Sequence, residues 1–455
     1  MRHDRLPDGF GVRLDPRVRT YSGGRYLVGD APMRLLRLAP EAAALIGDGY
    51  LEVTDRKSAV VARRLLDAGV GNPRPRLLPR PEDVTVIVPL HNDTEGLERL
   101  LRTLRGHSVI VVDDGSDRPV PIPRTGGRCR VTVLRHERRH GAAAARNIGL
   151  RAATTEFVAF VDSDMVPRAG WLEVMLGHFS DPEVALVAPR IVSREPAVTV
   201  LGRYEQTRSS LDCGRREAAV GARGVVSSVP GAALLVRRRA LLAEGGFDEQ
   251  TCSAADAGLC RRLERAGWRL RYEPAARVAC DHPVSFGKWF GRKVSDGVND
   301  TPAAPRPEPP SVPFWTVVAM ALLGIASRSS VLGAALTLVA ALVRLRRVFA
   351  ELDNPTRVAA IALARGFSGG VWRIVSVMCR NYWPVTVVAM IASRRVRRLA
   401  LTMAVADGLA DWFTHRDVGG LDPVRYLLCK RLDDIAYGTG LWYGVVRDRR
   451  GAPDL

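Results

Sequence analysis

The sequence predicts a fold of the α/β class, a doubly wound sheet with helices on both faces. Apolar strand-like runs alternate with helical patterns between residues 82 and 290, and this alternation is typical of a largely parallel sheet. Proline-rich stretches at residues 71–81 and 301–313 bound the region. Because ligands bind beyond the carboxyl ends of the strands in such sheets, polar residues that follow a strand are the first functional candidates.

Four strands are expected in the first part of this region, and each is rich in valine, isoleucine or phenylalanine. They span residues 84–90, 109–112, 131–134 and 157–161. After the first strand, leucines recur at helical spacing at positions 97, 100, 101 and 104. The order strand, helix, strand favours parallel pairing.

Residues 1–75 predict a small α+β module. Strand-like runs at 25–28 and 50–53 flank helical patterns at 33–38 and 59–66. The proline-rich stretch that follows is expected to be an extended linker, because proline fixes φ and lacks a backbone donor.

Residues 300–455 predict a helical region associated with a membrane. Apolar runs at 313–326, 331–343 and 383–392 are each shorter than the roughly 20 residues that cross a bilayer. Arginines follow the last two, at 344, 346 and 347 and at 394, 395, 397 and 398. Short apolar helices edged by arginine suit the surface of an acidic membrane. Buried helices of a soluble domain are the alternative.

The charge balance favours anionic partners, since Lys and Arg number 67 against 48 Asp and Glu. No zinc-type Cys/His spacing or aromatic–basic run is present, so nucleic acid is not an expected partner. The seven cysteines are scattered and form no CxxC pair, which indicates a reducing compartment. The first residues lack the apolar core of a secretory signal. We therefore expect the protein to be located at the cytoplasmic face of the cell membrane.

Carboxylates follow two of the expected strands. Asp114 ends the second, in Asp-Asp-Gly-Ser, where it can accept from a base N–H or a ribose hydroxyl; an ordinary turn is the alternative. Asp162 and Asp164 follow the fourth and suit a divalent cation, Mg²⁺ or Mn²⁺, bridging to a diphosphate. Between them, Arg146 lies on an alanine-rich helical segment and can reach a phosphate or pair with an aspartate. A surface arginine is the competing interpretation.

In this order the motifs resemble family two glycosyltransferases with the GT-A fold. The resemblance covers roughly residues 83–283. It runs through Thr85–Pro89, Val112–Ser116, Ala145–Gly149, Phe160–Asp164, Gly231–Val236, Gly245–Glu249 and Leu259–Leu263.

The resemblance implies a site for a nucleotide-diphosphate sugar. Asp114 would hold the base or ribose, Asp162 the ribose–diphosphate region, and Asp164 the metal. In the family an aromatic ring two residues after the position of Pro89 often stacks on the base, and His91 stands there in this chain.

The same resemblance implies a catalytic base and a further metal ligand. Asp256 matches the aspartate that deprotonates the acceptor hydroxyl, giving an inverting single displacement. The glutamate that usually precedes it is replaced by Ala255, so a mere helix cap is the alternative. His282 matches the histidine that often completes the metal shell; a surface histidine, or Cys280 at that position, competes with it.

The arrangement as a whole is similar to the mycofactocin-system glycosyltransferases. That similarity implies transfer of glucose from UDP-glucose to mycofactocin or its precursor peptide, and a membrane surface as partner. Its weakest part is the N-terminal module, which faintly resembles a peptide-binding chaperone domain. Two alternatives remain: a membrane-associated transferase for a cell-envelope glycan or glycolipid, and a degenerate, non-catalytic nucleotide-sugar-binding scaffold.

Overall fold

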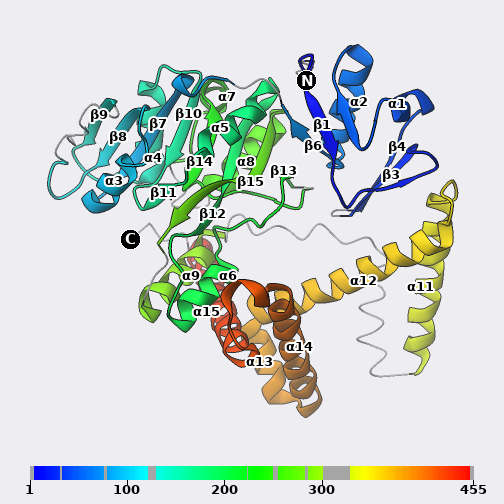
Figure 1. Ribbon diagram of the computed structural model, residues 1–455. Helices are drawn as coiled ribbons and strands as arrows, with labels where there is room; N and C mark the ends of the chain where they lie inside the picture. The colour runs from blue at the N-terminus through cyan, green and yellow to red at the C-terminus, as the bar shows by residue number, and fades with distance from the viewer. Residues whose placement is uncertain are drawn as a thin grey trace. The chain divides into compact units, whose positions relative to one another are not determined.

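The computed structural model describes residues 5–30, 33–75, 79–120, 130–222, 224–249, 255–281, 285–300 and 328–450. The chain divides into two compact units. The first combines Met1–Val198 with Arg208–His282, and the second combines Thr199–Thr207 with Pro283–Leu455 (Figure 1).

The first unit is built on a nine-stranded mixed sheet with the order β11-β15-β12-β14-β10-β7-β8-β9, and β13 pairs with β15. The strands are β7 (Val84–Leu90), β8 (Ser108–Asp114), β9 (Arg130–His136), β10 (Phe157–Val161), β11 (Met165–Pro167), β12 (Val184–Ser193), β13 (Ala218–Val220), β14 (Ala233–Arg237) and β15 (Arg269–Cys280). The four strands expected from the sequence are therefore confirmed. Strands β10, β7, β8 and β9 are parallel, as expected, whereas β14 runs antiparallel to β10 and β12.

Helices cover both faces of this sheet, as the sequence predicts. Successive residues of β7 point to opposite sides: Val86 and Val88 join one core, and Ile87 joins the other. The first core includes side chains of α3 (Thr94–Leu101) and α5 (Trp171–Leu176); the second includes α4 (Ala142–Ala152), α7 (Arg238–Ala243) and α8 (Ala255–Arg265). Two single 3₁₀ turns, η1 (Pro81–Asp83) and η2 (Gly177–Ser180), precede β7 and β12.

The N-terminal residues form two three-stranded antiparallel sheets, β5-β1-β6 and β2-β3-β4. Their elements are β1 (Gly11–Leu14), β2 (Arg19–Tyr21), β3 (Tyr26–Asp30), β4 (Met33–Arg37), α1 (Pro40–Ala44), β5 (Tyr50–Glu52), α2 (Arg56–Asp67) and β6 (Gly71–Arg74). Helix α2 contains the helical pattern expected at 59–66 and begins with a capping box between Asp55 and Ser58.

Two expectations for this region are wrong. Residues 33–37 are strand β4 rather than a helix, because their partial burial alternates and every residue pairs with β3. The start of the first proline-rich stretch is also a strand, since β6 pairs with β1. Pro73 is accommodated there because β6 is an edge strand, where a missing ladder donor is tolerated.

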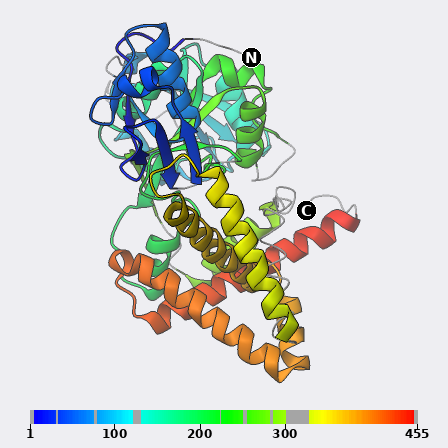
Figure 2. The ribbon, with the colours of Figure 1, turned by 90° about the vertical axis from the view of Figure 1, so that its right-hand side faces the viewer.

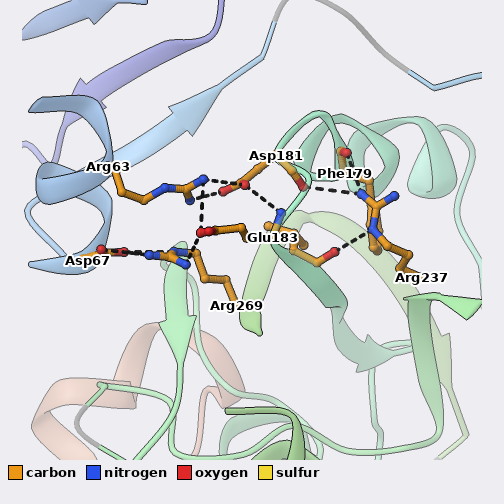
Figure 3. A network of polar contacts seen from close by, with 8 residues as sticks. Arg63, Asp67, Phe179, Asp181, Glu183, Arg237 and Arg269 are labelled. Atoms are coloured by element: carbon orange, nitrogen blue, oxygen red, sulfur yellow. Dashed lines mark hydrogen bonds and ion pairs between the residues drawn. The ribbon is translucent and has the colours of Figure 1, made fainter. Parts of the chain in front are cut away.

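The N-terminal elements contact the amino ends of β12 and β15 through a network of arginines and carboxylates (Figure 3). Arg63 of α2 donates to Asp181 at 2.6 Å and lies 3.3 Å from Glu183. Arg269 pairs with Asp67 at 2.7 Å and also with Glu183. The amino ends of these strands lie opposite the carboxyl ends where the candidate carboxylates are found, so this network is remote from the candidate site.

The second unit is helical and is drawn in yellow to red in Figures 1 and 2 apart from α6 and α9, which are green. It contains α6 (Val200–Arg208), α9 (Phe286–Asp300), α11 (Arg328–Val348), α12 (Pro355–Arg380), α13 (Trp383–Ala392), α14 (Arg394–Gly419) and α15 (Pro423–Arg450). The apolar run expected at 313–326 lies outside the described residues. Among those that are described, α12 is long and apolar enough to cross a bilayer, by length and composition, and the apolar runs expected from the sequence do not include it.

Candidate active site

The parallel strands bring the predicted carboxylates to one edge of the sheet. Asp114 ends β8, Asp162 follows β10, and β7 lies between these strands. Neighbouring strands are about 4.8 Å apart, so the two strand ends lie roughly 10 Å from each other. The topology therefore places Asp114 and Asp162 at the same end of the sheet, and their roles in binding a nucleotide sugar stay predictions.

Asp114 is buried, and both of its carboxylate oxygens accept hydrogen bonds. His136 Nδ1 lies 2.7 Å from Oδ1, and the backbone N–H groups of His140 and Gly141 donate at 2.9 and 2.7 Å. Burial by itself would raise the pKa of Asp114, but these hydrogen bonds outweigh it and hold the pKa below its ordinary value. The carboxylate therefore stays ionised and anchors the segment between β9 and α4.

The turn after Asp114 is fixed by its neighbour. Asp113 is fully buried, accepts from the Ser116 N–H at 3.0 Å and pairs with Arg135. Burial alone would raise the pKa of Asp113, yet the bonds from Ser116 and Arg135 lower it. Gly115 has φ +67°, and a Cβ there would lie 2.5 Å from the backbone of Arg138, so only glycine fits this turn.

The end of β7 contributes the residues expected near the nucleotide base. Pro89 is buried in the strand and pairs in register with Val112. His91 follows the strand, and its Nδ1 lies 3.0 Å from the carbonyl oxygen of Asp114. The ring is only partly buried, so the structure leaves it open to contact a base.

Asp162 is paired with Arg146 across the site. The Nη2 of Arg146 donates to Oδ1 of Asp162 at 2.7 Å, and the arginine is itself buried. Of the two roles considered for Arg146, pairing with an aspartate is therefore observed. Ser163 donates to Asp93 at 2.6 Å, which ties the turn after β10 to the start of α3.

The acidic turn after β10 fits a divalent cation. Asp162 and Asp164 supply hard oxygen donors, and the Asp162 side chain keeps about a third of its surface (32%) exposed. Within the described ranges no group of three or more His, Cys, Asp or Glu could enclose a metal ion. In Mg²⁺ and Mn²⁺ sites, one or two protein carboxylates commonly act together with substrate phosphates.

The remaining predicted residues are only partly described. The backbone of Asp256 lies in the first turn of α8, and its side chain is outside the description. His282 lies wholly outside the described residues. The described end of strand β15 lies beside the acidic turn, because Cys280 pairs with Met165. Asp281, one residue earlier, is held by Arg194 at 2.8 Å.

Two contributors were missed by reasoning from the sequence. His136 anchors Asp114, and its signal was its place at the end of the third strand, the same rule that selected Asp114. Asn147 binds the loop after α7; the sequence marked it only as a member of the Ala145–Gly149 motif, with no role assigned to it.

Comparisons with known proteins identify the family of the chain. The family model described as glycosyl transferase family 2 matches residues 85–242. The pre-mycofactocin glycosyltransferase of Mycobacterium tuberculosis (strain H37Rv) is 47% identical over 98% of this chain and 97% of that protein. Glycosyltransferase AglE of Haloferax volcanii is 26% identical over 47% of this chain and 71% of that protein. Among solved structures, mannosyltransferase PcManGT from Pyrobaculum calidifontis, in complex with GDP-Man and Mn²⁺, has a TM-score of 0.40 at 22% identity, covering 65% and 90% of the two chains.

Proposed function

The chain belongs to the pre-mycofactocin glycosyltransferases, within glycosyl transferase family 2, and we propose that it transfers glucose from UDP-glucose to mycofactocin or its precursor peptide. The similarity over nearly the full length of both chains carries this proposal. The hydrogen-bonded carboxylates at the strand ends support it, because Asp114 suits a base or ribose and Asp162 suits a cation that bridges to the diphosphate.

The proposed reaction is a single displacement with inversion. Asp256 takes the proton of the acceptor hydroxyl as the oxygen bonds to the anomeric carbon from the face opposite the diphosphate. The bond from that carbon to the diphosphate breaks, and UDP leaves. Arg146 keeps Asp162 oriented, and its charge offsets that of the carboxylate as the donor binds.

Asp162 and Asp164 would hold a divalent cation, Mg²⁺ or Mn²⁺, with His282 as a further ligand. When bound, the ion neutralises the negative charge that develops on the leaving diphosphate. On the opposite side of the nucleotide, His91 and the turn at Asp114 would contact the base and ribose.

A transfer assay tests the proposal. The protein is incubated with labelled UDP-glucose, Mn²⁺ and synthetic precursor, and product formation is followed. We expect labelled peptide product, and its loss in Asp256→Asn. Transfer only to lipid or glycan acceptors would refute the precursor peptide as acceptor and support a cell-envelope glycan or glycolipid instead. Binding of UDP without any turnover would instead support a scaffold, and turnover by Asp256→Asn would refute the assignment of the base.

We also propose that the helical unit binds the cytoplasmic face of the cell membrane. Some of its charged side chains are buried: Glu205, Lys293 and Asp407 are each at most 5% exposed. Its apolar side chains face outward: Val388 and Ile391 of α13 are 66% and 78% exposed, and α13 has no buried residue. An apolar helix whose side chains are exposed in this way suits contact with lipid.

Charge supports an acidic membrane as the partner. Helix α14 begins directly after α13 with Arg394, Arg395, Arg397 and Arg398. Flotation with vesicles of phosphatidylcholine, with and without phosphatidylserine, tests this directly. We expect binding that requires the anionic lipid and weakens when the four arginines become glutamine. Equal recovery of the protein with neutral vesicles would contradict the role of charge. If the protein does not float with either kind of vesicle, membrane binding is contradicted.

A further inference from the structure

The side-chain amide of Asn147 joins α4 to the loop that follows α7. Its Nδ2 donates to the carbonyl oxygen of Phe247 at 2.9 Å and to Oε1 of Glu249 at 2.7 Å. Its Oδ1 accepts from the Phe247 N–H at 2.8 Å. Asn147 is buried, so the loss of these bonds would leave polar atoms without water to replace them. The contact therefore fixes the backbone of this loop.

The backbone of the loop at 245–249 lies close to the Asn147 amide. Gly246 has φ +76°, and a Cβ there would lie 2.4 Å from Oδ1 of Asn147. The ring of Phe247 packs edge-on against Phe160 of β10, with centroids 4.9 Å apart. The approach of loop to helix thus depends on a missing side chain at one position and on a buried ring at the next.

The residue before Asn147 serves the donor side of the site. Arg146 binds Asp162 at 2.7 Å, and its guanidinium carbon lies 5.4 Å from the centroid of the Phe247 ring. Two consecutive residues of α4 therefore contact the acidic turn after β10 and the loop at 245–249. Helix α8 follows this loop in the sequence, and its first turn contains Asp256.

We propose that Asn147 is a positioning residue that aligns the acceptor side of the site with the donor carboxylates. It holds the loop at Phe247 and Glu249, which precedes α8 in the sequence, without contacting the nucleotide sugar. The inference rests on the proposed transferase function, and it assigns to Asn147 an effect on the acceptor that is separate from donor binding.

A polarity-reversal pair tests this assignment. In Asn147→Asp, the new carboxylate still accepts from the Phe247 N–H but faces Glu249 and the Phe247 carbonyl. Adding Glu249→Gln returns a donor to the carboxylate. We expect Asn147→Asp to lower kcat/KM for the acceptor about tenfold or more and to leave the KM for UDP-glucose within twofold. The double variant should recover to within about threefold of wild type.

A milder change guards against misfolding. Glu249 is exposed, so Glu249→Ala should fold normally and lose about threefold in kcat/KM for the acceptor. Glu244→Ala, at the end of α7, is the matched control and should change nothing. A silent Glu249→Ala together with no recovery in the double variant overturns the proposal. So does a donor KM that rises in step with the loss of transfer.

Hydrogen exchange separates this inference from the proposed function. Amides at 245–249 should exchange faster in Asn147→Asp and regain protection in the double variant, whether or not the chain transfers sugar. Unchanged exchange in Asn147→Asp refutes the positioning role. An inactive wild type with the expected exchange pattern refutes the transferase function and leaves the loop contact established.

Discussion

Replacing Asp114 with asparagine tests how the nucleotide edge of the site is held together. The variant removes a charge that accepts from His136 and from two backbone N–H groups. One oxygen becomes an NH₂ group, so if the amide keeps its carbonyl toward His136 and His140, a donor faces the Gly141 N–H. Hydrogen bonds to a charged group contribute about 1.5–3 kcal/mol each, and an unmatched buried donor costs about 1–3 kcal/mol. Allowing for relaxation, we expect a loss of about 2–4 kcal/mol.

A thermal melt and a UDP titration measure the effect. For a domain of this size, about 1 kcal/mol moves Tm by roughly 2–4 °C, so we expect Tm to fall by about 5–15 °C. UDP binding should weaken as well, because the segment between β9 and α4 loses its anchor. Asp117→Asn is the matched control, since Asp117 lies in the same turn but is exposed and accepts from Asn92.

The same variant has a defined pH dependence. The folded pKa of Asp114 lies below its ordinary value of 3.8, so its stabilisation is present above that pH and is lost as the pH falls through the folded pKa. The difference in stability between wild type and Asp114→Asn should therefore be constant near neutrality and shrink below about pH 4. A variant as stable as wild type at pH 7, or a difference that grows in acid, would refute the argument.

Two further predictions concern the packing around the site and the attachment of the N-terminal elements. Gly149→Ala should destabilise the protein by about 1–3 kcal/mol, because the added Cβ would lie 2.4 Å from Cγ2 of Ile87. Gly258→Ala is the control and should not destabilise it, because its Cβ would meet nothing closer than 3.8 Å. Thermal melts in which both variants behave alike would contradict this packing. Arg63→Ala should destabilise the protein by about 3 kcal/mol in denaturant titrations, because it leaves Asp181 and Glu183 buried with one cation fewer. Arg64→Ala, at an exposed position of the same helix, is the control. Equal unfolding midpoints for the two variants would show that the network in Figure 3 contributes little to stability.

Much of the fold was predictable because the sheet is buried on both faces. Strands β7, β8 and β10 appear in the sequence as largely apolar runs, which have few other uses in a soluble domain, whereas the edge strand β9 is only partly buried. Strand β4 was misassigned because five partly exposed residues carry too little periodicity to separate a strand from a helix. Helix α12 was overlooked because glycines and arginines, among them Arg365, Gly369 and Arg373, interrupt its apolar character.

The candidate site was predictable in its carboxylates but not in their partners. Asp114 and Asp162 follow strands, so the topology of a parallel sheet places them at one edge. Their partners His136 and Arg146 come from other elements, and which one meets which carboxylate depends on register and helix placement. The bonds of Asn147 to residues about a hundred positions later are of the same kind. Local pattern carries no information on such contacts.

The central claim is that the acidic turn after β10 binds an ion together with the diphosphate of the donor. Calorimetric titration of UDP into the protein, with and without Mn²⁺, tests it most directly when wild type and Asp164→Asn are compared. The account predicts that Mn²⁺ strengthens UDP binding at least tenfold in wild type and about twofold or less in the variant. UDP affinity that ignores Mn²⁺, or an equal gain in both proteins, would contradict it.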